Sequence, residues 1–435
     1  SLSEILLPKY IYGLAASNDI STGLIYLALL YNKCSFLIFD PSILKNKNTF
    51  ISSLGIDKIL SSISLFGLAN DKYEIEKEID RDLNLHLYRN KIENKRIKIK
   101  SPSILLNTSG SSGIPKIVRI SYENLISNTT GIIQSLNLTA QDQSISTLPL
   151  FYTYGLSIFN THMYTGGTFY ITNNSILQKP FEEEISNFKP SIFSGVPSTF
   201  QILKKIDYLH LRQPFIKKIT QAGGALDKAS QIEILEICSS TKDFYVMYGQ
   251  TEATARISCF NLRTNPKKIG SVGLPLNNIS IEINDMNDDD KIGRICIKGP
   301  SITTGYISSC SELEIEPKTR ILDTGDLGYL DKDGFLFITG RSSRFCKING
   351  KRYNLDVIEQ EYNSSNSNKI CVVSDDIFLF VFSTESISKK SINYINKNYI
   401  INNYDNFALD KSISKIFNCN LAFFSFLTKR TYIFF

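Results

Sequence analysis

A run of nine residues, TSGSSGIPK from Thr108 to Lys116, combines the residue types that a polyphosphate site needs. Glycine adopts positive φ without a side-chain clash, so main-chain N–H groups can turn toward phosphate oxygens. The hydroxyl side chains donate hydrogen bonds without bulk, and Lys116 supplies a cation for the outer phosphates. The residues expected to bind phosphate beside Lys116 are Thr108, Ser109, Gly110, Ser111, Ser112 and Gly113.

The same run does not match a Walker loop. Its glycines stand three positions apart and Pro115 precedes the lysine, so the pattern G-x-x-x-x-G-K-[ST] does not fit. The run follows a candidate strand, ILLN, and leads into another, IVRIS, so it implies no helix dipole. A P-loop kinase or ATPase is therefore disfavoured, and a plain turn of serine and glycine remains the alternative to a phosphate site.

A second segment, YGQTE, begins at Tyr248 directly after the candidate strand FYVM. A strand that ends here would deliver these side chains to one edge of a sheet. Glu252 offers the hard carboxylate oxygens that Mg²⁺ prefers, and Thr251 can donate a hydrogen bond to a phosphate. Tyr248 offers a ring on which a base can stack. An ordinary turn is the alternative interpretation.

A third segment, DTGD from Asp323 to Asp326, is followed by Gly340 and Arg341. An acidic residue on a tight glycine turn can bind both hydroxyls of a ribose, and Arg341 can reach the same sugar or a phosphate. A pair of β-turns is the alternative. The order and spacing of the three segments favour a single nucleotide site.

Composition excludes several other classes of protein. The chain has 435 residues, of which 42% are hydrophobic and 21% charged, as in ordinary globular proteins. A net charge of +6 over this length does not require nucleic acid as a partner. The three histidines are far apart and lack metal-ligand spacing, so a zinc site built by the protein is not expected.

Cysteine usage and hydropathy predict a cytoplasmic protein. None of the eight cysteines forms a CxxC pair and most lie in apolar runs, which is typical of buried free thiols in a reducing compartment. The early apolar run Leu24–Tyr31 is much shorter than the roughly 20 residues that span a bilayer. No basic stretch precedes it, so neither a transmembrane segment nor a signal peptide is expected.

The elements that must position these segments alternate between helix and strand. A helix opening at Ser21 and the apolar strand of residues 34–40 begin the pattern, which indicates an α/β fold. Ser121 is expected to cap a helix that begins YENL. From about residue 270 to 340, short alternating runs separated by Gly, Asp and Asn predict a β-rich region. A domain boundary is expected near Ser342.

With these segments in view, the chain resembles the acyl-adenylate-forming (AMP-binding) superfamily, which includes acyl-CoA synthetases, peptide-synthetase adenylation domains and luciferases. The resemblance covers about residues 11 to 360 and follows the family's order of motifs. It is most similar to stand-alone bacterial ligases. The motifs that carry it are LPLFYTYG, SGVPSTF, QAGGAL, YGQTEATAR, GSVGLP, GRICIKGPSITTGY, DTGDLGYLDKDGFLFITGR and KINGKRYN.

The resemblance implies a fold, a domain division and a reaction. The fold would be a large N-terminal domain of α/β layers (residues 1–341) with a small β-rich subdomain (about 256–341). A small mobile α+β C-terminal domain (342–435) would follow. The reaction would use ATP and Mg²⁺ to activate a carboxylic acid as an acyl-adenylate with release of pyrophosphate. A thiol, from CoA or from the phosphopantetheine of a carrier protein, would then capture the acyl group.

The resemblance also assigns residues to that reaction. Lys116, Thr251 and Glu252 would be catalytic, with Glu252 holding Mg²⁺. Nucleotide contacts would include Gly223, Gly224, Ala225, Tyr248, Gly249, Asp326 and Arg341. The acid would lie against Tyr152, Gly155, Ser194 and Gly195. Members of the family that select α-amino acids carry an aspartate where this chain has Tyr152, so we expect an acid without a free α-amino group.

The C-terminal end departs from the family pattern. Relatives carry a loop similar to P-x-T-x-x-G-K, whose lysine crosses to the α-phosphate, whereas this sequence reads FSFLTKRTYIFF. Lys429 is the nearest candidate for that lysine. The apolar end could be a packed final strand, a surface for a partner or membrane, or an altered terminus. A catalytically weakened ATP- or acyl-binding protein of the same fold is therefore the alternative function.

Overall fold

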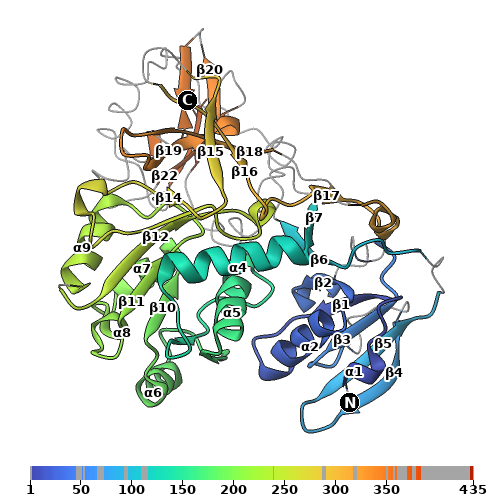
Figure 1. The fold of residues 1–435 in the computed structure, drawn as a ribbon. Helices are drawn as coiled ribbons and strands as arrows, with labels where there is room; N and C mark the ends of the chain where they lie inside the picture. The colour runs from blue at the N-terminus through green and yellow to red at the C-terminus, as the bar shows by residue number, and fades with distance from the viewer. Residues whose placement is uncertain are drawn as a thin grey trace.

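The structure is a computed structural model. It describes residues 2–45, 51, 54–65, 73–92, 97–108, 116–238, 240–286, 291–316, 321–348, 351–355, 358–359, 370–374, 379–383 and 432–434. Figure 1 shows the described segments with their labels. Two large sheets and a smaller third sheet carry the segments that sequence analysis selected, and helices pack between and around them.

The first sheet carries the phosphate-loop candidate near one edge. Its strand order is β17-β7-β6-β2-β1-β3-β5-β4. Strands β1, β2, β3 and β6 run parallel, and β6 and β7 form an antiparallel hairpin. The strands are β1 (Ile11–Ala15), β2 (Ser35–Phe39), β3 (Lys58–Ser61), β4 (Tyr73–Asp80), β5 (Leu85–Asn90), β6 (Ser103–Thr108), β7 (Lys116–Ser121) and β17 (Tyr306–Ile307).

The second sheet carries the YGQTE segment. Its order is β14-β13-β12-β11-β10-β8-β9, in which β8 to β12 are parallel and β13 is antiparallel to β12. The strands are β8 (Gln143–Ile145), β9 (Thr168–Tyr170), β10 (Ile192–Gly195), β11 (Lys218–Gln221), β12 (Asp243–Tyr248), β13 (Ser258–Asn261) and β14 (Leu274–Pro275).

The third sheet is antiparallel and carries the DTGD segment. Its strands, in the order β15-β16-β18-β19, are β15 (Ser280–Asn284), β16 (Gly293–Lys298), β18 (Leu322–Leu330) and β19 (Leu336–Arg341). Two small antiparallel sheets follow. They contain β20 (Phe345–Ile348) with β21 (Lys351–Asn354), and β22 (Ile370–Ser374) with β23 (Leu379–Ser383) and β24 (Tyr432–Phe434).

Helices cover both large sheets. The α-helices are α1 (Leu2–Ile5), α2 (Ile20–Tyr31), α4 (Tyr122–Leu136), α5 (Thr153–Thr165), α6 (Lys179–Phe188), α7 (Pro197–Lys204), α8 (Leu209–Arg212) and α9 (Lys228–Cys238). Short 3₁₀ turns are η1 (Pro41–Lys45), η3 (Thr251–Ala253), η4 (Pro266–Lys268), η5 (Cys310–Glu314) and η6 (Ser342–Arg344). The α/β class expected from the sequence is confirmed.

Helix α4 connects the first large sheet to the second. Ser121, the last residue of β7, caps it by accepting a hydrogen bond from the N–H of Asn124, and the Asn124 side chain accepts one from the N–H of Ser121. The predicted cap is therefore confirmed. From that cap α4 runs through the centre of the molecule (Figure 1), and Ile132 and Leu136 pack into the core beneath the second sheet.

Other sequence expectations can also be checked against these elements. The five cysteines that the structure describes in full (Cys34, Cys238, Cys259, Cys296 and Cys310) are free and buried, as predicted. Within the described ranges, no helix is long and apolar enough to cross a membrane. The third sheet lies within the range predicted to be β-rich, whereas β13 and β14 belong to the second sheet. The division into domains stays a prediction.

Candidate functional site

The candidate phosphate loop joins the two strands of a hairpin. Thr108 and Lys116 face one another in the register of β6 and β7, and the Thr108 hydroxyl donates to the Lys116 carbonyl oxygen at 3.4 Å. This pairing brings the two ends of the loop together. Ser109, Gly110, Ser111, Ser112 and Gly113 lie outside the described residues, so their predicted contacts with phosphate stay predictions.

Lys116 and Glu252 meet the same tyrosine. The Lys116 ammonium lies 4.9 Å from the centre of the Tyr306 ring. The Tyr306 hydroxyl donates a hydrogen bond to Oε1 of Glu252 at 2.6 Å. Tyr306 occupies this place because β17 pairs with β7, with Tyr306 opposite Val118. A cation from β7 and a carboxylate from the turn after β12 thus contact one aromatic side chain, Lys116 at its ring and Glu252 at its hydroxyl.

The turn that carries Glu252 is held by hydrogen bonds with Thr303 and Thr153. It forms the 3₁₀ turn η3 just beyond β12, and the N–H of Thr303 donates to the Glu252 carbonyl oxygen at 2.9 Å. The hydroxyls of Thr251 and Thr153 are hydrogen-bonded at 2.9 Å. Because Thr153 begins α5, this contact links the turn to the helix that borders the predicted acid pocket.

The donor set fits a magnesium ion brought in with a nucleotide. Across the described residues there is no group of three or more His, Cys, Asp or Glu side chains that could hold a metal by itself. Mg²⁺ is usually bound by one or two carboxylates together with phosphate oxygens and water. The partly exposed Glu252 carboxylate beside the Lys116 hairpin can supply such a ligand.

Asp326 connects the third sheet to the second. Its Oδ2 accepts a hydrogen bond from the Tyr248 hydroxyl, and its Oδ1 lies 3.1 Å from Nε of Arg341. Burial, followed by the Asp326 charge, raises the pKa of Tyr248 well above its usual value. The DTGD segment was expected to form a turn, but it lies within strand β18 beside an irregularity in the pairing with β16. Asp326 is buried and lies opposite Arg341 of the adjacent strand β19.

The QAGGAL segment follows β11 and reaches Tyr152. A Cβ atom on Gly223 would lie 2.5 Å from the Tyr152 hydroxyl, and Gly223 has a φ of +79°, so glycine is required on both counts. The next two residues, Gly224 and Ala225, are exposed. Ser194 and Gly195 end the neighbouring strand β10, so the carboxyl ends of parallel strands gather these residues at one edge, where α/β proteins bind ligands.

A small cavity of about 20 Å³ lies between the second sheet and helices α4 and α5. Ser194 lines it from the sheet, where it accepts a hydrogen bond from Thr220 at 2.8 Å, and Thr220 is bonded to the Tyr154 hydroxyl at 2.8 Å. Burial raises the pKa of Tyr154 to about 12. Arg256, which is 2% exposed, also lines the cavity.

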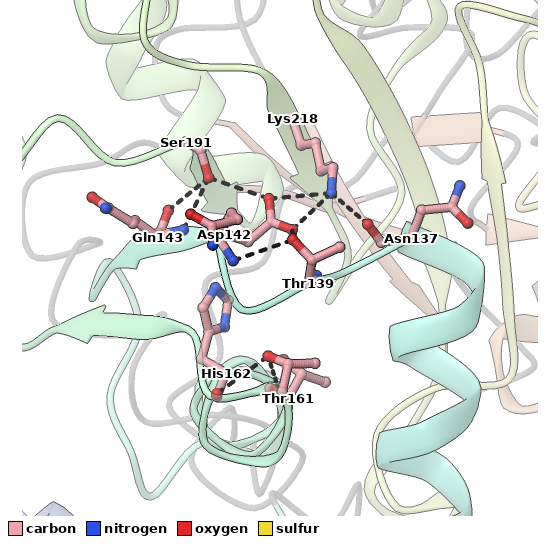
Figure 2. A network of polar contacts seen from close by, with 10 residues as sticks. Asn137, Thr139, Asp142, Gln143, Thr161, His162, Ser191 and Lys218 are labelled. Atoms are coloured by element: carbon pink, nitrogen blue, oxygen red, sulfur yellow. Dashed lines mark hydrogen bonds and ion pairs between the residues drawn. The ribbon is translucent and has the colours of Figure 1, made fainter.

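His162 also lines the cavity. His162 lies eight positions after Tyr154 on α5, which corresponds to about 12 Å along the helix. Figure 2 shows the His162 ring extending toward the loop that carries Thr139 and Asp142. There, Lys218 pairs with Asp142 at 3.1 Å and holds the loop against the sheet.

Two predicted site glycines have close main-chain contacts. A Cβ atom on Gly155 would lie 2.3 Å from the carbonyl oxygen of Pro149, and one on Gly249 would lie 1.8 Å from that of Ala255. Glycine at both positions is therefore required by packing. Contacts of Gly249 with nucleotide and of Gly155 with the acid stay predictions.

Two residues at the site, Tyr306 and Arg256, were not expected there from the sequence. Tyr306 ends the quoted motif GRICIKGPSITTGY, and Arg256 ends YGQTEATAR. Their positions within those motifs were the only indication in the sequence that they belong to the site. Their contacts depend on strands and helices far away in the sequence. Lys429 lies outside the described residues, so its predicted catalytic role stays a prediction.

Comparison with known proteins identifies relatives of the chain. The sequence profile of the AMP-binding enzyme family matches residues 36–307. A 2-succinylbenzoate–CoA ligase of Listeria monocytogenes is 30% identical over 304 residues, which cover 68% of this chain and 58% of that enzyme. An oxalate–CoA ligase of Saccharomyces cerevisiae is 26% identical over 81% of this chain and 66% of that enzyme. The chain therefore spans somewhat more than half the length of these relatives.

Solved structures share the fold. The o-succinylbenzoate CoA synthetase of Bacillus subtilis, solved with its acyl-adenylate intermediate, superposes with a TM-score of 0.69 at 19% identity and covers 91% of this chain and 83% of its own. ATP-bound MatB of Rhodopseudomonas palustris superposes with a TM-score of 0.68 at 17% identity, covering 92% and 85%. Since the curated relatives are ligases, the alternative of a weakened binding protein gains no support.

Proposed function

Because the chain belongs to the AMP-binding enzyme family, we propose that it is an AMP-forming acid–thiol ligase that uses ATP, Mg²⁺ and CoA. Its acid substrate has no free α-amino group. The observation that carries the proposal is the meeting of Lys116 and Glu252 at Tyr306, because a triphosphate tail needs both a cation and a magnesium ligand within reach.

The first half-reaction joins the acid to the nucleotide. A carboxylate oxygen of the acid attacks the α-phosphorus of ATP, the bond from the α-phosphorus to the bridging oxygen breaks, and pyrophosphate leaves. The attacking carboxylate is already ionised near neutral pH, so no general base is needed. The protein contributes by aligning the reactants and neutralising phosphate charge, with Lys116 at the hairpin and Thr251 at the turn.

The nucleotide's remaining contacts would come from the second and third sheets. Asp326 would accept hydrogen bonds from the ribose hydroxyls, with Arg341 beside it, while Tyr248 and residues 223–225 would border the base. Glu252 would hold the magnesium ion, whose charge withdraws electron density from the phosphates when it is bound. In the second half-reaction the thiol of CoA attacks the acyl carbonyl carbon and AMP leaves.

The charge around Tyr152 supports an acid without an ammonium group. Tyr152 stands at the start of α5 where amino-acid-selecting relatives place an aspartate, and the charge that acts on its hydroxyl is that of Arg256. An ammonium here would therefore lack a counter-charge and would face a buried cation. Both effects make its burial costly.

A carboxylate panel tests the proposal. Purified protein is supplied with ATP, Mg²⁺ and single acids, with and without CoA, and pyrophosphate and AMP are measured. We expect pyrophosphate with one or more acids lacking an α-amino group, and thioester only when CoA is present. Release of orthophosphate with ADP, or activity with α-amino acids alone, would contradict the proposal. A carrier-protein thiol would be indicated by adenylate formation without transfer to CoA.

We also propose that the enzyme acts in the cytoplasm.

A further inference from the structure

Arg256 is a fully buried cation without a carboxylate partner among the described residues. Its side chain is 2% exposed, and its Nε atom is buried without a hydrogen-bond partner. The guanidinium carbon lies 4.6 Å from the centre of the Tyr154 ring. The other side-chain groups that act on its charge are Cys259 and Tyr152, which are neutral. Buried charges in folded proteins are normally paired, so this one lacks its counter-ion.

The main chain around Arg256 holds this cation in a fixed place. The Asn128 side chain, on α4, donates to the Arg256 carbonyl oxygen at 2.7 Å and accepts from the Arg256 N–H at 3.2 Å. Directly before it, Thr254 and Ala255 both have positive φ, 59° and 108°. Such backbone strain in residues other than glycine persists only where the surrounding structure enforces it, and it is typical of functional sites.

The same arginine lines the cavity beside the predicted acid pocket. Tyr154, Ser194 and Thr220 border that cavity with polar atoms, and the rest of its lining is mainly aliphatic. The cavity is small, about 20 Å³, so it has room for only one small group. An arginine in such a place can bind the two oxygens of a carboxylate at once.

We propose that the acid substrate is a short dicarboxylic acid, whose second carboxylate pairs with Arg256 while the first reacts with ATP. This inference rests on the proposed function and names the substrate class of the same site. Substrate binding would supply the counter-ion that the free protein lacks. A fatty acid of similar length would instead leave the guanidinium unpaired and place a methyl group against it.

Chain-matched acid pairs test the proposal. The kcat/KM for pyrophosphate release is measured with succinate against butyrate and with glutarate against pentanoate, for the wild type, Arg256→Met and Arg256→Lys. We expect the wild type to prefer one or both dicarboxylates over their partners by on the order of 100-fold, because the monocarboxylate leaves a buried charge unpaired. Arg256→Met should lose or reverse the preference, and Arg256→Lys should keep part of it.

A binding measurement separates the two proposals. Thermal unfolding is followed with succinate, glutarate, butyrate or pentanoate alone, without ATP. If a dicarboxylate stabilises the wild type but not Arg256→Met, the anion site at Arg256 is supported. This holds even if no acid leads to pyrophosphate release, because the lack of pyrophosphate would count against the ligase alone. Equal turnover and equal thermal shifts with both members of each pair would overturn the dicarboxylate proposal and leave the ligase standing. That comparison needs only the wild type, so it decides the matter even if Arg256→Met fails to fold.

Discussion

The Tyr306 hydroxyl donates a hydrogen bond to Oε1 of Glu252 at 2.6 Å, while the ring of the same tyrosine faces the Lys116 ammonium. Burial and the Glu252 carboxylate raise the pKa of Tyr306, so its proton stays on the hydroxyl at neutral pH. Tyr306 therefore orients the proposed magnesium ligand. The same side chain contacts both Glu252 and the lysine that is expected to meet the phosphates.

Replacing Lys116 with alanine should slow adenylate formation. Loss of one charge that stabilises the departing pyrophosphate is expected to lower kcat by about 10²–10³-fold. The fold should persist, because the Lys116 side chain is exposed. The measurement is steady-state pyrophosphate release, with Lys332→Ala, another exposed lysine, as the control. Equal rates for Lys116→Ala and the control would remove Lys116 from the site.

Tyr306 and Glu252 should act as one unit toward magnesium. Glu252→Gln weakens the carboxylate ligand and Tyr306→Phe removes only the hydroxyl that orients it, so each should raise the Mg²⁺ concentration for half-maximal rate by about 10-fold or more. The double variant should cost less than the product of the two single effects. Titration of Mg²⁺ measures this, with Glu282→Gln on the third sheet as the control. Multiplicative effects would mean that the two side chains act separately.

Asp326 should recognise the ribose hydroxyls. The wild type is expected to use ATP better than 2′-deoxy-ATP, because a hydroxyl accepted by a buried carboxylate contributes to binding. Asp326→Asn should reduce that discrimination by about 10-fold while leaving the KM of the acid unchanged. Ratios of kcat/KM for the two nucleotides measure it. Undiminished discrimination in Asp326→Asn would place the ribose elsewhere.

His162 should make the protein sensitive to acid. Its Nδ1 lies 2.8 Å from the Ile158 carbonyl oxygen, and burial lowers its pKa. The unfolded chain binds this proton near pH 6.5 and the folded chain only at lower pH, so stability falls as the pH drops below about 6.5. His162→Gln should flatten the loss of Tm between pH 7 and 5. An identical pH dependence in wild type and His162→Gln would exclude this group.

Much of the framework could be predicted because it depends on local sequence. The apolar run of residues 34–40 contains β2, and the capping residue Ser121 precedes α4 as its side-chain chemistry requires. The positions of Glu252 and Lys116 at strand ends also follow from the sequence, since turn residues interrupt apolar runs there.

The remaining features depend on pairing between distant segments. Tyr306 reaches the site only because β17 pairs with β7, and no local pattern encodes that pairing. The sequence around Arg256 does not indicate that its side chain is buried. The burial follows from the packing of α4 and α5 on the second sheet. The DTGD segment has turn composition, yet strands β16 and β19 on either side draw it into the third sheet.

The most direct test of the shared nucleotide site is acid-dependent exchange of radiolabelled pyrophosphate into ATP. We expect exchange that requires both a carboxylic acid and Mg²⁺, and that falls by at least about 100-fold in Lys116→Ala and in Glu252→Ala. Exchange at the wild-type rate in both variants would contradict it, because ATP would then be bound and cleaved somewhere other than beside Tyr306.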